Sequence, residues 1–436
     1  MHDLRRQALE SKKTVSRKAQ SRVSSRASSA TNSRTHSRNP SRQASDDEDG
    51  NMSDSTNWSV NSIGDMLALE LPEDTAEGWK ESVGNLIEKI VDRKRSSVQE
   101  REENLEAYDH YFMGRYSIEA LEGRTTELFP AFLKSVKTES SEKETCFALR
   151  AIAITLITIP SETAYDGLFQ ALKTAYTSSE FSSVKASAIH ALGVAAMYGG
   201  AGDTGLEEIM DDLLEIIESD GTSIEAEDSA EVVIAACQEW GFLATSLEDI
   251  EARTESAMDA FVEQLESSDT SVQVAAGENI ALLYEKSWTD REEADGPPCK
   301  DRNENAVAAI EAKYVKRYEV YRHKNQLEHT LTQLANESSR RVSKKDRKTL
   351  HSSFSDILNT VNHPALGPRF SMAMDEDGFI LGSRMKLHTF AGVKMIDRWW
   401  KLLVLQALKR VLGPGFLNHY RNNEVVYESL PLDGDN

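Results

Sequence analysis

The chain has few cysteines, and their placement excludes several kinds of site. Cys146, Cys237 and Cys299 are the three cysteines among 436 residues, and no two of them form a CxxC pair. This spacing argues against a zinc ribbon or a disulfide framework and favours a reducing compartment. We expect a cytoplasmic protein, with the nucleus as a second compartment.

Long apolar runs are also missing. The sequence contains no run of eighteen apolar residues, so we expect no membrane-spanning segment and no membrane partner. The basic N-terminus lacks the apolar stretch of a secretory signal, so we do not interpret it as one.

Enzyme signatures are absent as well. The sequence has no P-loop, no GxGxxG after a strand, no HExxH and no GxSxG. Its histidines are scattered without metal-ligand spacing, and acidic pairs such as Glu207–Glu208 fit solvated helix faces. We therefore predict a protein that is not an enzyme, with no catalytic residue, metal, cofactor or small-molecule substrate.

Charge is distributed in blocks along the chain. The whole protein has a formal net charge of −22, whereas residues 1–45 carry +9 and residues 46–310 carry −37. Residues 384–421 contain eight Lys or Arg and one acid, Asp397, for a net charge of +7. This pattern indicates polyanion binding at the ends of the chain and a solubilising body between them.

Residues 1–60 form a Ser/Arg-rich segment that we predict to be disordered, because it has too few apolar residues to offset the entropy of ordering. Arginine stands three residues before several serines, a spacing that suits basophilic kinases. The candidate phosphorylation sites are Ser25, Ser37, Ser41 and Ser45. The alternative is a tail that only adds solubility.

Residues 61–286 are predicted to form armadillo/HEAT-like helical repeats. Four alanines at spacings of 40, 48 and 40 residues each begin a common pattern: Ala first, a large apolar residue fifth, and Ala or Gly sixth. The four alanines are Ala148, Ala188, Ala236 and Ala276. Such periods are typical of α-solenoids, in which small residues let neighbouring helices approach closely. The predicted fold class is therefore all-α.

The remaining sequence divides into an exposed loop, residues 287–305, and a C-terminal helical basic module, residues 306–436. The stretch from Glu311 to Ala335 is predicted to be helical, with Tyr314, Tyr318 and Tyr321 on one face at i, i+4 and i+7. This stripe favours a place in the core over a base-stacking platform. A basic run follows, which includes Lys344, Lys345 and Arg347.

The last long helix is predicted to have two faces. At 100° per residue, Lys394, Arg398, Lys401 and Lys409 fall within an arc of about 80°, and Ile396, Trp400 and Leu403 fall on the opposite side. Gly413 and Pro414 are expected to end the helix. One interpretation is a phosphate-tracking surface. The alternatives are a basic face that pairs with the acidic repeats and a membrane-surface helix.

Two segments carry a family resemblance: SKKDRKTLHSSFSDILNTV (Ser343–Val361) and the stretch from Met385 to Leu430. Together they resemble the C-terminal domain of the interferon-related developmental regulator family. SVKASAIHALGVA (Ser183–Ala195) resembles that family's armadillo-like N-terminal domain. One departure is that the family helix has a single Trp where this chain has Trp399 and Trp400.

The resemblance implies a non-catalytic, ribosome-associated repressor of translation. In such proteins the C-terminal helical segment enters tRNA-binding space, contacts rRNA and keeps the ribosome inactive. By motif position, the implied rRNA contacts are Lys394, Arg398, Lys401, Lys409 and Arg410, with Lys344, Lys345 and Arg347 as further contacts. The implied partners are rRNA and ribosomal proteins. The alternative is a nuclear transcriptional co-regulator, in which the solenoid is a scaffold for co-regulator complexes.

Overall fold

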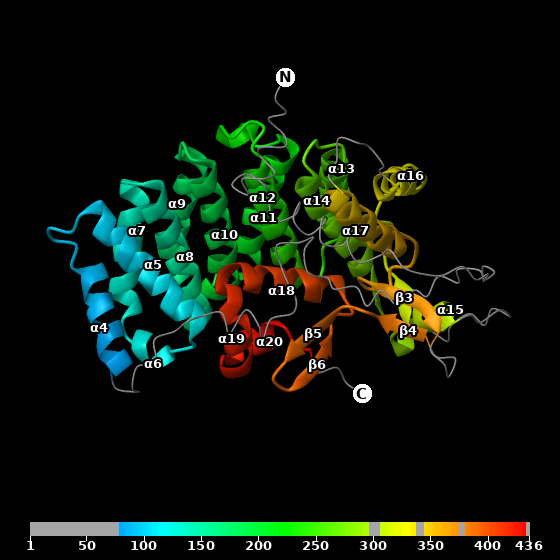
Figure 1. Cartoon of the computed structure of the whole chain (residues 1–436). Coiled ribbons are helices and arrows are strands. Elements are labelled where there is room, and N and C mark those ends of the chain that lie inside the picture. The colour runs from blue at the N-terminus through cyan, green and yellow to red at the C-terminus, as the bar shows by residue number, and fades with distance from the viewer. Residues whose placement is uncertain (1–77, 296–305, 337–343, 375–379, 433–436) are drawn as a thin grey trace, which may run out of the picture. The chain divides into compact units, whose positions relative to one another are not determined.

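The computed structural model describes residues 78–295, 306–336, 344–374 and 380–432, all within one compact unit that spans Met52–Asn436. The predicted disordered tail and its four candidate serines lie outside these residues. The described part opens with four helices (Figure 1): α4 (Gly78–Val91), α5 (Val98–Gly114), α6 (Ile118–Leu121) and α7 (Thr125–Thr138).

The described residues form five successive helix pairs, and each pair packs on the next (Figure 1). They are α7 with α8 (Glu142–Thr158), α9 (Ala164–Ser178) with α10 (Ser182–Gly199), α11 (Gly202–Glu218) with α12 (Ala230–Ser246), α13 (Glu251–Gln264) with α14 (Thr270–Lys286), and α16 (Lys324–Ala335) with α17 (Lys344–Asn362). A short 3-10 helix, η1 (Thr222–Ile224), joins α11 to α12. The predicted all-α solenoid is confirmed.

The second helices of the pairs, α8, α10, α12, α14 and α17, contact one another in this order and form the inner layer. Each of the four predicted alanines is fully buried in this layer. A Cβ atom on Gly193 would lie 1.9 Å from Glu239 Oε2, and one on Gly241 would lie 2.1 Å from Asn279 Oδ1. The glycines at the sixth position are therefore needed for close helix packing, as the repeat pattern predicts.

Three antiparallel two-stranded sheets in the described residues interrupt the helices, and the sequence did not indicate them. They are β1 (Trp288–Asp290) with β2 (Tyr314–Lys316), β3 (Phe370–Met374) with β4 (Ile380–Ser383), and β5 (Lys386–Thr389) with β6 (Gly392–Met395). A 3-10 helix, η2 (Glu293–Asp295), and α15 (Ala306–Glu311) lie between β1 and β2.

The prediction of one helix from Glu311 to Ala335 with a tyrosine stripe is wrong, because Tyr314 lies in β2 and α16 begins only at Lys324. Val315 pairs with Thr289 in β1, and Arg317 forms an ion pair with Asp295 at 2.8 Å. These contacts with the preceding segment hold residues 314–317 in an extended conformation. Tertiary pairing here overrides the helical period.

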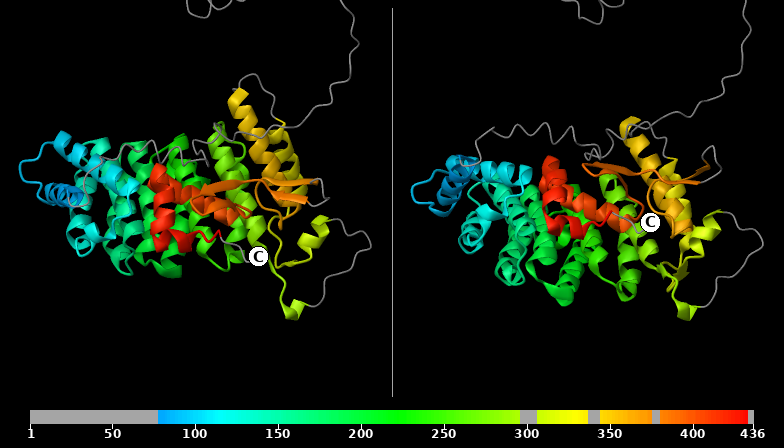
Figure 2. Two further views of the ribbon diagram at one scale, coloured as in Figure 1. Left: turned by 60° about the horizontal axis from the view of Figure 1, so that its bottom comes forward. Right: turned by 90° about the horizontal axis from the view of Figure 1, so that it is seen from below.

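The C-terminal helices lie across the inner layer (Figure 2). They are α18 (Trp399–Leu412), α19 (Phe416–Asn422) and α20 (Glu424–Ser429), with the 3-10 helix η3 (Gly413–Gly415) between α18 and α19. Helix α18 contacts α8, α12 and α14, whereas α19 contacts α5 and α20 contacts α8. The C-terminal helices are thus packed on the repeats.

Candidate nucleic-acid interface

The start of α18 is fixed by a carboxylate from the repeats. Glu285 in α14 accepts hydrogen bonds from the backbone amides of Trp399 at 2.8 Å and Trp400 at 3.1 Å. Burial raises the pKa of Glu285, and Arg398 and the two amide donors oppose this shift. The carboxylate satisfies amides that a helix start leaves without partners. The helix ends at Leu412, and Gly413 follows with a φ of 50°, as the sequence predicts.

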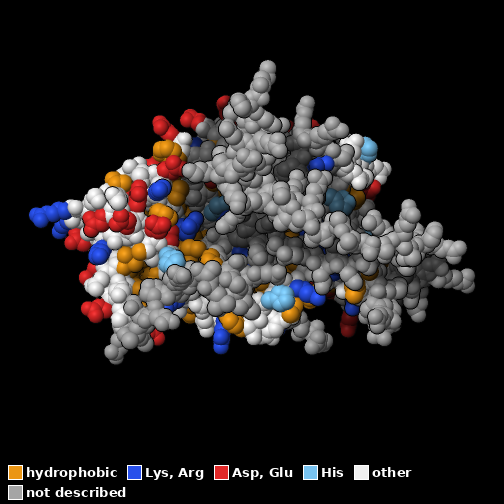
Figure 3. Space-filling view, in the orientation of Figure 1, with side chains coloured by type: hydrophobic (Ala, Val, Ile, Leu, Met, Phe, Trp, Pro, Cys, Tyr) orange, Lys and Arg blue, Asp and Glu red, His pale blue; other side chains and the backbone are white. Residues whose placement is uncertain are grey.

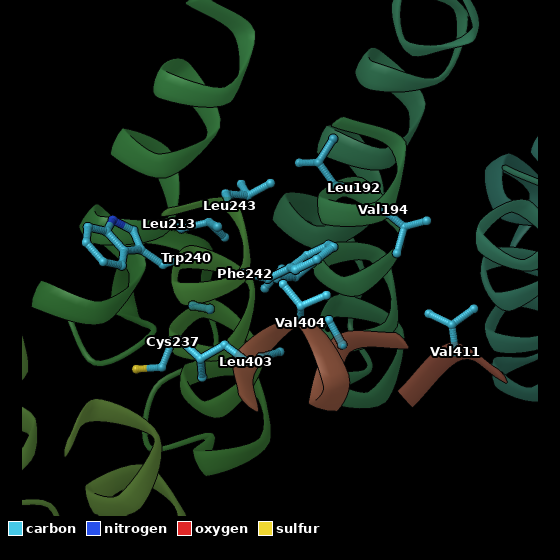
Figure 4. Close-up of a cluster of buried hydrophobic side chains, with 14 of the residues drawn as sticks. Leu192, Val194, Leu213, Cys237, Trp240, Phe242, Leu243, Leu403, Val404 and Val411 are labelled. Carbon is cyan, nitrogen blue, oxygen red and sulfur yellow. The ribbon is translucent and has the colours of Figure 1, made fainter. Parts of the chain in front are cut away.

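One side of α18 is buried against the inner layer. Leu403, Val404 and Val411 point into a cluster of apolar side chains from α10, α11 and α12 (Figure 4). Leu403 lies so close that a Cβ on Gly241 would be 3.2 Å from its Cδ1 atom. The predicted inward orientation of Leu403 is confirmed. Of the two tryptophans, Trp399 is buried and Trp400 is partly exposed.

The predicted four-cation helix face is wrong in its geometry. Lys394 lies in β6 and Arg398 is the N-cap residue, so only Lys401 and Lys409 of the four belong to α18. A 100° projection that starts at Lys394 fails because the chain is extended there. In β6, Lys394 is half-buried and stands opposite Leu387 of β5.

Two of the predicted RNA contacts in α18, Lys409 and Arg410, make internal contacts instead of forming an open face. Arg410 donates to Glu239 at 2.8 Å and to Gln238 at 2.7 Å. Lys409 is 8% exposed, with its ammonium 5.8 Å from the centre of the Phe416 ring. The prediction that Lys409 lies on an exposed cationic face is wrong, because its side chain is buried. Arg410, which the resemblance implies as an rRNA contact, is also turned into the fold. The structure shows Arg410 paired with Glu239 of the acidic repeats, which is the alternative interpretation of the basic helix.

Lys401 and Arg398 are partly buried by their neighbours. Lys401 forms an ion pair of 2.7 Å with Asp397, and its side chain is 13% exposed. Arg398 donates to the Tyr314 hydroxyl, and its guanidinium lies 4.6 Å from the centre of the Tyr314 ring. This stack links β2 to the start of α18.

The basic run before α17 is described only in part. Lys344 and Lys345 begin α17, and their side chains lie outside the described residues. Arg347 is half-buried. Whether these three cations, or Lys394, Arg398, Lys401, Lys409 and Arg410, contact RNA stays a prediction.

The structure places other cations on the outside of the β5–β6 hairpin, which sequence reasoning did not select. We define the hairpin surface as Arg384, Lys386, His388, Phe390 and Arg421, all of which are exposed. The alternation of exposed and buried residues in β5 directs Lys386 and His388 outward and Leu387 and Thr389 inward. This alternation, followed by a turn at Phe390, is the signal that could have found them.

The hairpin surface combines cations with an exposed aromatic ring. The Arg421 guanidinium of α19 lies 5.1 Å from the centre of the Phe390 ring, which is 45% exposed. No ion pair among the described residues involves Arg384, Lys386 or Arg421. A His and Lys/Arg side chains are visible near this hairpin, whereas the end formed by α4, α5 and α7 shows many acidic side chains with some Lys/Arg among them (Figure 3). Cations beside an exposed ring suit contacts with phosphates and unpaired bases.

Two further features of the described residues bear on the kind of site. No helix there is long and apolar enough to cross a membrane. The same residues hold no group of three or more His, Cys, Asp or Glu side chains arranged to bind a metal ion.

Comparison with known proteins identifies the family. Residues 44–362 match the sequence pattern of the interferon-related developmental regulator family. The chain belongs to this family. It is also 27% identical over 381 residues to the uncharacterized protein C20F10.03 of Schizosaccharomyces pombe, an alignment that covers 85% of this chain and 79% of that protein. The family match ends at residue 362, so the resemblance of Met385–Leu430 to the family's C-terminal domain stays a prediction.

Proposed function

We propose that this member of the interferon-related developmental regulator family binds the ribosome without catalysis and holds it inactive in the cytoplasm. Its C-terminal segment would contact rRNA in tRNA-binding space. The observation that carries the proposal is the hairpin surface, an exposed group of cations on a protein with a net charge of −22. The family resemblance supports the ribosome as the source of the RNA.

The physical basis of the proposal is phosphate neutralisation. Arg384, Lys386 and Arg421 extend from the β5–β6 hairpin and α19, outside the ion pair that uses Arg410. Each cation that contacts a phosphate releases condensed counterions, so binding weakens as salt rises. The acidic repeats would repel other parts of the RNA and favour basic ribosomal proteins.

Sedimentation through sucrose gradients tests the proposal with the full chain. We expect the wild-type protein to sediment with ribosomal particles at low salt and to dissociate as salt rises. Replacing Arg384, Lys386 and Arg421 by Glu should weaken the association. A plot of log affinity against log salt should also become less steep, by about one unit of slope for each phosphate that the variant no longer neutralises. Absence of the wild-type protein from ribosomal fractions at low salt would refute the proposal.

A matched control separates local contacts from total charge. Lys134, Lys137 and Lys143 are exposed on α7 and α8, and their replacement by Glu changes the net charge by the same amount. This control should leave ribosome binding close to that of the wild type. An equal loss in both triple variants would show that net charge, and not the hairpin surface, governs binding.

The alternative function remains a nuclear transcriptional co-regulator that acts as a scaffold. In the described residues α18, α19 and α20 cover part of the inner layer, so that part is not open to a partner. Co-regulator complexes would then bind elsewhere on the repeats. Nuclear enrichment together with absence from ribosomal fractions would favour this alternative.

A further inference from the structure

A groove between α16 and α17 is separate from the hairpin surface and has different chemistry. It is open to solvent and has a volume of about 320 Å³. Its lining contains no Lys, Arg, Asp or Glu, and amide and hydroxyl side chains dominate it. The lining includes Asn336, His351, Ser355, Asn359 and Asn362.

The polar residues of α17 form a single line along the groove. The spacing i, i+4, i+8 and i+11 places four of them on one helix face: His351, Ser355, Asn359 and Asn362. The opposite face of α17, with Phe354 buried, packs on α14. With a rise of 1.5 Å per residue, the line is about 16 Å long, the length of about five residues of extended chain.

Among the residues that line the groove, one hydrogen bond joins the two helices and another lies at the end of α16. His351 Nδ1 lies 2.9 Å from the backbone oxygen of Ala335, and Asn336 donates to the backbone oxygen of Thr332 at 2.8 Å. In contrast, the side chains of Ser355, Asn359 and Asn362 have no hydrogen-bond partner among the described residues. Their donors and acceptors therefore face the open groove.

These groups match the peptide unit. A side-chain amide offers a donor and an acceptor together, which is the complement of a backbone C=O and N–H. A nucleic acid is a poorer fit, because this lining contains neither Lys nor Arg for phosphates and no Phe, Tyr or Trp for base stacking.

We propose that the groove binds an extended segment of a partner protein through the segment's main-chain amides, with Asn359 and Asn362 as the principal contacts. Lys348 is exposed on α17, one turn before His351, so the bound segment carries an acidic side chain at that end. The site does not depend on ribosome binding, and either proposal can fail alone.

Peptide selection with the full chain tests the groove. A random twelve-residue library displayed on phage is selected against the wild-type protein, and the selected peptides are measured by fluorescence anisotropy. We expect the double variant Asn359→Ala/Asn362→Ala to weaken binding at least about 10-fold, since each amide makes two hydrogen bonds to the peptide and each bond contributes a factor of about 2 to 12. Lys348→Glu should weaken binding of the peptides that carry an acidic end.

The control variant removes two amides from the same helix pair outside the groove. Asn325→Ala/Gln326→Ala on α16 changes exposed residues and should leave peptide affinity and Tm unchanged. A peptide with two N-methylated amides should lose binding, because methylation removes main-chain donors and keeps the side chains. Selected peptides that bind the Asn359/Asn362 variant as tightly as the wild type, or that tolerate N-methylation, would overturn the proposal.

Discussion

The ion pair between Arg410 and Glu239 distinguishes a structural role of α18 from an RNA-binding one. Arg410 is 13% exposed and the Glu239 side chain is 1% exposed, with the two groups 2.8 Å apart. Glu239 Oε1 also lies 2.8 Å from His190 Nδ1, and burial followed by the charge of Arg410 lowers the pKa of His190. The decisive change is Arg410→Ala, which leaves the Glu239 carboxylate without its cationic partner.

Arg410→Ala should destabilise the folded protein by about 3–5 kcal/mol, the usual loss when one member of a buried ion pair is removed. The Gln238 hydrogen bond at 2.7 Å is removed as well. The double variant Arg410→Met/Glu239→Gln should recover much of the loss, because it leaves no unpaired buried carboxylate. Added salt should change the loss little, since the pair is shielded from solvent.

Urea unfolding of the full chain, followed by circular dichroism, measures this loss. The comparison is Lys386→Ala, an exposed cation of the hairpin surface, which should change the free energy of unfolding by less than about 0.5 kcal/mol. If Arg410 contacted RNA, as the family resemblance implies, Arg410→Ala would leave stability intact and reduce the salt dependence of ribosome binding. A loss below about 1 kcal/mol would refute the docking of α18 through Glu239.

Two further substitutions test the packing. Gly241→Ala should destabilise the folded protein by about 1–3 kcal/mol, because its Cβ would lie 2.1 Å from Asn279 Oδ1. Gly167→Ala should stabilise it by about 0.5–1 kcal/mol, because a Cβ there would meet no atom within 4 Å. Thermal unfolding of both variants checks this. Asp109 is buried without a hydrogen bond to its carboxyl oxygens, and burial raises its pKa well above the ordinary value. The stability from its protonated form is present below the unfolded pKa of about 3.9 and is lost as pH rises towards the folded pKa. Asp109→Asn should therefore remove part of the fall in Tm between pH 5 and pH 8, and parallel profiles for variant and wild type would contradict this.

The repeats could be predicted from sequence because their packing repeats at a local spacing. Ala148 and Ala188 occupy equivalent places in α8 and α10, and each is fully buried. The small residues are required by neighbouring helices in every layer, so the same pattern recurs. The end of α18 was also predictable, because Gly413 ends the helix through its own backbone conformation and needs no distant residue.

The candidate site was less predictable because distant residues determine it. Whether Arg410 points to solvent or to the repeats depends on Glu239, which lies 171 residues earlier in the chain. Similarly, the start of α18 depends on Glu285, and the extended state of Tyr314 depends on its pairing with Asp290. No period within α18 or β2 contains this information, so the helical projection assigned cations to the wrong surface.

The basic composition of the C-terminal segment therefore has two origins. Part of it balances the acidic inner layer, since Arg410 pairs with Glu239. Another part, Arg384, Lys386 and Arg421 on the hairpin surface, has no such internal ion pair among the described residues. A −22 protein that keeps exposed cations beside its acidic repeats gives up some internal pairing by doing so. These exposed cations are the ones that the proposed ribosome binding assigns to phosphates.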